Sequence, residues 1–181
     1  YLGLAWAPHA DRFYVSGGDD DDVLEFTLGG GRWSQGRAVA LGHAAGLGVG
    51  IKPEVAGLAV APDGRRLLVA NLENDSVSLI DLDRGAVAAE LDLRPGVLDP
   101  SRSGQPGGTF PQPVAWVSNA KAYVGTLRDR ELIGLDISGD RMSIASRTGV
   151  RGQPTALLAS ADGRTLFAAM DNTDGVAVLD T

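Results

Sequence analysis

Four consecutive aspartates, Asp19 to Asp22, form the densest group of potential ligand atoms in this sequence. Calcium binds carboxylate oxygens, but its loops space the carboxylates and add a backbone carbonyl, as in D-x-D-x-D-G. Neighbouring residues on an extended backbone point to opposite sides, so at most two of these four side chains could converge on one ion. Aspartate and glycine also suit turns, because Asp caps its own backbone. We therefore interpret the stretch VSGGDDDDVLEF as a hairpin turn, with a calcium site as the alternative.

The second group with chemical potential is LRDRE, in which Arg128 and Arg130 flank Asp129. Alternation in a hairpin would place both guanidinium groups on the same side. Two such groups could clamp a carboxylate or a phosphate. The alternative is a cluster of exposed ion pairs with Asp129, Glu131 and the acidic turn of a neighbouring repeat, which we favour because exposed charges pair readily at little energetic consequence.

Residues for nucleophilic or metal-assisted catalysis are scarce. The only histidines are His9, in a predicted turn, and His43, in a long connector, and cysteine is absent. No G-x-S-x-G motif occurs, and GLGVGIKP lacks the G-K-[ST] ending of a phosphate-binding loop. The sequence predicts no catalytic group, no metal site and no cofactor in this segment, and it leaves open whether the whole protein is an enzyme.

The charge balance excludes two classes of partner. The formal net charge is −7, whereas binding to nucleic acid or to an anionic membrane surface requires a basic patch. No apolar run approaches the length of a membrane span, so direct membrane insertion is not expected. The small-molecule ligand, if one exists, cannot be named from the sequence.

Internal repeats determine where these groups must lie. The stretch LAWAPHADRFYVSGGDDDDVLEFTL aligns without a gap with LAVAPDGRRLLVANLENDSVSLIDL, so that Val15 falls on Val69 and Val23 on Val77. A third copy begins VAWVSNAKAYVGT, and a fourth, TALLASADGRTLFAAMDNTDGVAVLD, places Asp180 on Asp81. Self-similarity at this period is typical of solenoids and propellers.

Each copy contains short β-rich runs separated by turn residues. In the second copy we predict strands over 55–61, 66–72, 76–82 and 87–93, with the turns PDGR, ENDS and DRG between them. Four antiparallel strands in about 40 residues describe a propeller blade. Trp6 and Trp116 fall on first strands and are expected in the core, whereas Trp33 is expected to be more exposed.

The predicted architecture is all-β: a single partial β-propeller over 1–181, with blades at 1–42, 55–93, 113–150 and 154–181 and long connectors at 43–54 and 94–112. The fourth blade has three predicted strands, and an open array would expose apolar flanks. We therefore expect these residues to be cut from a seven- or eight-bladed ring, and we expect the remaining blades or a protein partner to cover the flanks.

The stretch APDGRRLLVANLENDSVSLIDLDRGAVAAELDL resembles the YVTN-type bacterial β-propeller repeat, whose signature strand reads YVS, LVAN, YVG and FAA in the four copies. A narrower similarity joins PGGTFPQPVAWV and AYVGTLRDREL to bacterial proteins that fuse such a propeller to an alkaline-phosphatase-like phosphoesterase domain, which would lie beyond Thr181. The family resemblance implies a location in the periplasm or at the cell surface.

One face of the propeller is the expected site of binding. Turns after second strands and connectors after fourth strands lie on the same side, and long loops are often functional. We name this side the loop face. Its candidate ligand- or partner-binding residues are Asp19, Asp20, Asp21, Asp22, Glu73, Asp75, Arg128, Asp129, Arg130, Asp171 and Asp174.

Three functions are compatible with this picture. The first, which we favour, is a non-catalytic binding or scaffolding module that acts through the loop face. The second is the propeller domain of a larger phosphoesterase whose catalytic domain lies outside this segment. The third is a quinoprotein-dehydrogenase-like or electron-transfer propeller subunit, which would need cofactor-contacting residues along the channel that this segment scarcely offers.

Overall fold

The computed structural model describes residues 3–42 and 50–181, which form four antiparallel sheets. Blade 1 contains β1 (Leu4–Trp6), β2 (Arg12–Ser16), β3 (Asp22–Gly29) and β4 (Arg32–Ala40). Blade 2 contains β5 (Val55–Val60), β6 (Arg66–Asn71), β7 (Ser76–Asp81) and β8 (Ala86–Asp92). Blade 3 contains β9 (Pro111–Ser118), β10 (Lys121–Thr126), β11 (Glu131–Ser138) and β12 (Arg141–Gly149). Blade 4 contains β13 (Gln153–Ala159), β14 (Thr165–Asp171) and β15 (Gly175–Asp180).

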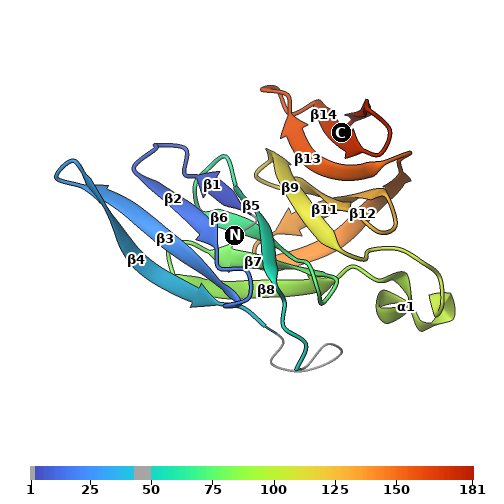
Figure 1. Cartoon of the computed structure of the whole chain (residues 1–181), viewed down its shortest axis with the longest axis horizontal. Coiled ribbons are helices and arrows are strands. Elements are labelled where there is room, and N and C mark those ends of the chain that lie inside the picture. The colour runs from blue at the N-terminus through green and yellow to red at the C-terminus, as the bar shows by residue number, and fades with distance from the viewer. Residues whose placement is uncertain (1–2, 43–49) are drawn as a thin grey trace.

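The sheets follow one another around an arc, from the blue sheet of blade 1 to the red sheet of blade 4 (Figure 1). The first strands β1, β5, β9 and β13 contact one another in sequence along the inside of the arc. This arrangement confirms the predicted all-β propeller fold. The predicted strands of the second copy agree with β5 to β8 to within one residue at each end.

Alternating side chains explain why these strands stack as blades. Leu67 and Val69 of β6 pack in an apolar cluster with blade 1, whereas Leu68 and Ala70 of the same strand pack in a cluster with blade 3. A third cluster joins blade 3 to blade 4 and includes the fully buried Leu166. Successive residues of a strand face opposite sides, so a blade that is apolar on both faces needs a neighbour on each side. Each fully buried leucine stabilises the fold by about 2 kcal/mol.

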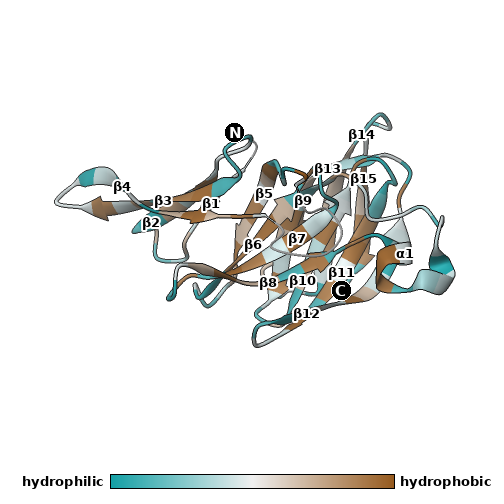
Figure 2. Ribbon diagram, turned by 90° about the horizontal axis from the view of Figure 1, so that it is seen from below, coloured by the Kyte–Doolittle hydropathy of each residue, from teal (hydrophilic) through white to brown (hydrophobic). Residues whose placement is uncertain are grey.

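The outer flanks of blades 1 and 4 leave such residues exposed. Blade 1 extends away from the rest of the chain, and hydrophobic segments lie along β1 and β3 (Figure 2). Trp6 is 53% exposed, and its ring lies 5.5 Å from that of Trp33. The prediction that Trp6 lies in the core is wrong, because no described sheet covers this side of blade 1. Trp116 is buried as predicted, and its indole N–H donates to the Ala59 carbonyl at 2.8 Å.

The connector between blades 2 and 3 carries two short helical turns, α1 (Pro95–Leu98) and η1 (Pro100–Arg102). The other long connector includes His43, which lies outside the described residues together with the rest of 43–49. Across 3–42 and 50–181, no helix is long and apolar enough to cross a membrane.

Candidate functional site

Two turn aspartates on the loop face join blade 1 to blade 2 and blade 2 to blade 3. Asp21 and Asp75 immediately precede the third strands of blades 1 and 2. The Oδ1 atom of Asp21 accepts the backbone N–H of Glu54 at 3.0 Å, and the Oδ1 atom of Asp75 accepts that of Phe110 at 3.0 Å. Glu54 and Phe110 each immediately precede the first strand of the following blade. These two candidate residues therefore hold consecutive blades together.

The four consecutive aspartates form the β2–β3 turn, and they do not converge. The backbone N–H of Asp21 donates to the Gly18 carbonyl at 3.0 Å, which closes the turn, and Asp22 begins β3. Lys52 approaches from the connector and donates to the backbone carbonyl of Asp19 at 2.8 Å. In the described part of the chain, no group of three His, Cys, Asp or Glu residues is arranged to hold a metal ion.

The end of the second connector, Gly107 to Pro111, is held by carboxylates of blade 3. Glu131 accepts the N–H of Gly108 at 3.1 Å, and Asp129 accepts the N–H of Thr109 at 2.8 Å and its hydroxyl as well. Glu131 also forms an ion pair with Arg147 at 3.0 Å. A β-carbon on Gly108 would lie 2.1 Å from the Leu93 carbonyl oxygen, so the backbone approach there requires glycine.

Phe110 lies beside Asp75 in a backbone conformation that bulky residues rarely adopt. Its φ is 57°, in the left-handed region. Such strain amounts to about 1–3 kcal/mol and persists only where the surroundings over-determine it, often at functional sites. Here the hydrogen bonds to Asp75 and Asp129 fix the segment, and the guanidinium carbon of Arg128 lies 4.1 Å from the centre of the Phe110 ring.

The structure separates the two arginines that the sequence suggested as a clamp. Arg128 stacks on Phe110, whereas Arg130 has a φ of 55° and donates to the carbonyl of Arg151 at 3.4 Å. The positive φ breaks the alternation on which the clamp hypothesis depended. The carboxylate of Asp129 accepts a hydrogen bond from Thr109 and forms no ion pair with either arginine. The expected cluster of ion pairs around the two arginines is therefore not present among the described residues.

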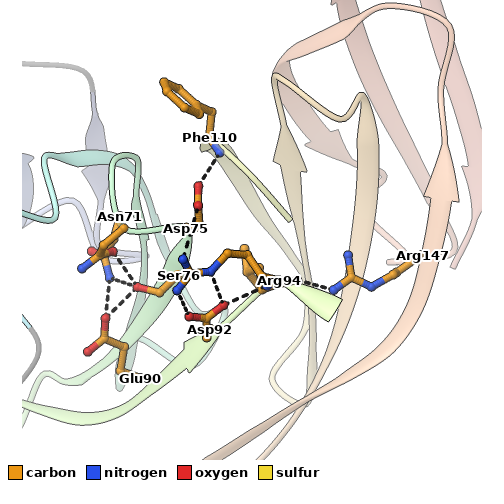
Figure 3. A network of polar contacts seen from close by, with 10 residues as sticks. Asn71, Asp75, Ser76, Glu90, Asp92, Arg94, Phe110 and Arg147 are labelled. Carbon is orange, nitrogen blue, oxygen red and sulfur yellow. Dashed lines mark hydrogen bonds and ion pairs between the residues drawn. The ribbon is translucent and has the colours of Figure 1, made fainter. Parts of the chain in front are cut away.

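A cavity of about 480 Å³ lies between this connector and the turn of blade 3. Its lining residues are Arg94, Gly96, Val97, Ser103, Gly104, Gln105, Pro106, Gly107, Thr109, Arg128 and Asp129. Ser103 to Pro106 are exposed, so the cavity opens to solvent. Of its two arginines, Arg94 is neutralised by Asp92, to which it donates from Nε at 3.0 Å and also from Nη2 (Figure 3). Among the described residues, Arg128 forms no ion pair.

A buried polar network lies next to the Asp75 junction (Figure 3). The amide nitrogen of Asn71 donates to Ser76 Oγ at 2.8 Å and to Ser78 Oγ at 2.9 Å, and Ser76 Oγ lies 2.6 Å from Glu90 Oε1. Asn71 is the last residue of β6, and it is completely buried. Its role in this chain is to hold the strands that flank the β6–β7 turn, because buried polar groups need partners.

The remaining candidate residues stay at the rim or apart from the cavity. Glu73 is exposed in the β6–β7 turn, and Asp19 and Asp20 are exposed in the β2–β3 turn. Asp171, the last residue of β14, and Asp174, in the β14–β15 turn of blade 4, are exposed. Of the sequence candidates, only Asp75, Arg128 and Asp129 come together around the Gly107–Pro111 segment.

Sequence reasoning missed the groups that receive or complete these contacts, namely Glu54, Arg94, Gly108, Thr109, Phe110 and Arg147. The sequence held one signal for Glu54 and Phe110. Their partners Asp21 and Asp75 occupy the same position of the repeat, which indicates a common structural role. A left-handed phenylalanine leaves no mark in the sequence, because propensity argues against it.

Burial raises the pKa values of three carboxyl groups on the loop face above those of exposed carboxyl groups. Desolvation is the largest cause for Asp22, Glu54 and Asp75. For Asp75, the hydrogen bond from Phe110 and the charge of Arg94 partly oppose that rise in pKa. A carboxyl group with a raised folded pKa contributes stability that is present below its unfolded pKa and lost as the pH rises through the folded pKa.

We therefore expect the melting temperature to rise as the pH is lowered from neutral towards about 4. Below that range it should fall, because hydrogen bonds lower the pKa values of Asp81, Asp99 and Asp162, and these groups lose their contribution once they are protonated. Thermal unfolding followed by circular dichroism between pH 7 and pH 3 measures this. A melting temperature that falls steadily from pH 7 downwards would contradict it.

The sequence matches no family model, and no characterised protein matches it in sequence. The resemblance to YVTN-type repeats, the fused phosphoesterase domain and the location in the periplasm or at the cell surface therefore stay predictions. The fold is similar to that of many solved structures.

Three structural neighbours illustrate the match. One is hydrazine synthase of Kuenenia stuttgartiensis, with 22% identity, a TM-score of 0.74, and 99% of this chain and 45% of that chain covered. Another is a protein from Lactobacillus plantarum, with 13% identity, a TM-score of 0.77, and coverage of 99% and 53%. The third is the β-propeller domain of Cps50 (Swd1) from Myceliophthora thermophila, with 9% identity, a TM-score of 0.72, and coverage of 98% and 57%. At these identities the likeness shows the fold alone, and this chain spans about half the length of the structures it matches.

Proposed function

We propose that this chain is a binding module of a β-propeller protein, and that it binds a carboxylate side chain of a protein partner in the cavity lined by Arg128. The observation that carries the proposal is Arg128, whose guanidinium group lines the cavity and forms no ion pair among the described residues, although its charge partly opposes the rise in the pKa of Asp75. The other charged groups that line the cavity already have partners. Arg94 pairs with Asp92, and Asp129 accepts hydrogen bonds from Thr109.

The stacking of Arg128 on Phe110 favours a carboxylate as the ligand. The guanidinium carbon lies 4.1 Å from the centre of the ring, a cation–π contact in which the planar group can keep N–H donors for a ligand. The edge of an arginine matches the two oxygens of a carboxylate in a bidentate pair. Because the contact with the ring restricts the Arg128 side chain, less side-chain freedom is lost when the ligand binds.

The rim of the same face indicates what surrounds that carboxylate on the partner. Asp19, Asp20 and Glu73 are exposed there, and the net charge of the chain is −7. Complementary charge steers association and excludes wrong partners. The partner surface should therefore be basic around one acidic side chain, and association should weaken as the salt concentration rises.

The anchoring contact can be tested with N-acetylglutamate methylamide, which carries one glutamate side chain and no other charge. In an NMR titration we expect a Kd of about 5 mM, with the amide shifts of Thr109 and Asp129 moving most. Arg128→Gln should raise the Kd about tenfold or abolish binding.

Arg130→Gln is the matched control, because Arg130 lies in the same turn but contacts Arg151. It should leave the Kd within a factor of two. If Arg128→Gln does not weaken binding, or if both variants weaken it equally, the cavity is not the carboxylate site.

A further inference from the structure

The residue before the third strand reaches the next blade at every junction inside this chain. Asp21 and Asp75 accept N–H groups from residues immediately preceding β5 and β9. Arg130, at the same position in blade 3, donates to the carbonyl of Arg151, two residues before β13. Blade 4 has Asp174 at this position, immediately before β15.

Asp174 has the geometry of the two engaged aspartates. The φ values of Asp21, Asp75 and Asp174 are 56°, 56° and 49°. Asp174 is exposed, and in the described part of the chain its carboxylate accepts no hydrogen bond and forms no ion pair. It is therefore placed to receive a backbone N–H group that no described residue supplies.

The side of blade 4 beneath Asp174 repeats a buried surface of blade 2. Phe167 pairs with Val178 across blade 4, just as Leu68 pairs with Leu79 across blade 2. Leu68, Val77 and Leu79 are completely buried against blade 3. Their counterparts Phe167, Val176 and Val178 are 37%, 61% and 62% exposed.

We propose that this side of blade 4 docks a further β-blade, and that Asp174 accepts the N–H of the residue preceding the first strand of that blade. The proposal does not depend on the cavity lined by Arg128. It rests on the internal repetition of Asp21 and Asp75, on the apolar surface that matches blade 2, and on the structural neighbours, of which this chain spans about half.

A second copy of this chain fits the surface less well than a further blade. The residue before β1 is Gly3, and its N–H already donates to Ser16 Oγ at 2.8 Å. The occupant we assign is therefore a blade that resembles blades 2 and 3, not blade 1 of another copy.

The chain itself supplies the probe blade. Thr181 aligns with Leu82, so a second copy of residues 83–149 can follow Thr181 directly and bring the β8 strand, the connector and blade 3. In this extended protein, the N–H of the second Phe110 should meet Asp174, as the first meets Asp75. We expect a monomer in which the amide hydrogens of β15 exchange at least about tenfold more slowly than in the 181-residue chain.

Asp174→Ala should lower the melting temperature of the extended protein by about 6 °C and that of the 181-residue chain by at most about 2 °C. The backbone strain of alanine at positive φ is common to both proteins, so the difference isolates the new contact. Asp171→Ala, at the end of β14 and three residues before Asp174, is the matched control and should shift both proteins equally.

Three results would overturn the proposal. One is an added blade that stays unfolded on a folded 181-residue core. Another is an Asp174→Ala shift of the same size in both proteins. The last is a 181-residue chain that dimerises in solution with slowly exchanging β15 amides, because a second copy would then cover this side of blade 4.

Discussion

Gly57→Ala is expected to destabilise the fold by about 4 kcal/mol, the largest loss we expect from one added methyl group. A β-carbon at this position would lie 1.8 Å from the carbonyl oxygen of Gln112, which belongs to β9 of the next blade. Backbone atoms cannot rotate away as a side-chain end can. The inner strands β5 and β9 would therefore have to separate, and the apolar cluster between blades 2 and 3 would loosen with them.

Gly149→Ala is the matched control for this prediction. Gly149 lies at the end of β12, and a β-carbon there would meet nothing within 4 Å. Urea denaturation should give an unchanged midpoint for Gly149→Ala and a much lower one for Gly57→Ala. Equal midpoints in the two variants would mean that the blades can part at no cost, and that the inner strands do not position the loop face.

A similarly close contact between a glycine and the backbone of the next blade occurs at the junction of blades 1 and 2. A β-carbon on Gly3 would lie 2.2 Å from the carbonyl oxygen of Ala56, and Gly3 and Gly57 occupy the same position of the repeat. The close contact of first strands is therefore a repeated feature of the arc. It sets the spacing at which the Oδ1 atoms of Asp21 and Asp75 reach the following blade.

The parts of the fold that the sequence predicts are those set within one repeat. Short runs of β-branched and aliphatic residues, separated by turn residues such as Pro-Asp-Gly, determine β6 and β7, because each strand needs only its neighbours in the chain to pair. The same local reasoning explains why the prediction for Trp6 failed. A first strand is buried only where the preceding blade covers it, and the repeat of blade 1 does not contain that information.

The candidate site was predictable in part, for a related reason. Asp75 and Asp129 were selected because acidic turn residues recur on one face, but their partners Phe110 and Thr109 belong to a connector that is not repeated. Contacts between a turn and a non-repeated connector depend on the folded path of the chain. The left-handed φ of Phe110 is further opposed by local propensity, and it exists because tertiary contacts prevail over that propensity.

Asp75→Ala should destabilise the protein by about 3 kcal/mol, since it removes three things at one junction. The N–H of Phe110 loses its acceptor, Arg94 loses a carboxylate that lies 4.0 Å from its Nη1, and alanine must adopt a φ of 56°. Asp75→Asn keeps an acceptor oxygen and tolerates the left-handed conformation, so it should lower stability by only about 1 kcal/mol. Thermal or urea unfolding of the two variants measures the difference.

Asp174→Ala in the 181-residue chain is the control that separates strain from contact, because Asp174 has nearly the same φ and no described partner. The excess loss in Asp75→Ala is then the contribution of the junction. The consequence should extend to binding: without the Asp75 hydrogen bond Phe110 can leave its strained conformation, and Arg128 then loses the ring on which it stacks. Asp75→Ala should therefore also weaken the affinity for N-acetylglutamate methylamide, at a temperature where the variant is still folded. If Asp75→Ala lowers stability as expected but leaves this affinity unchanged, Phe110 does not position Arg128. The left-handed backbone of Phe110 then serves only the packing of the blades.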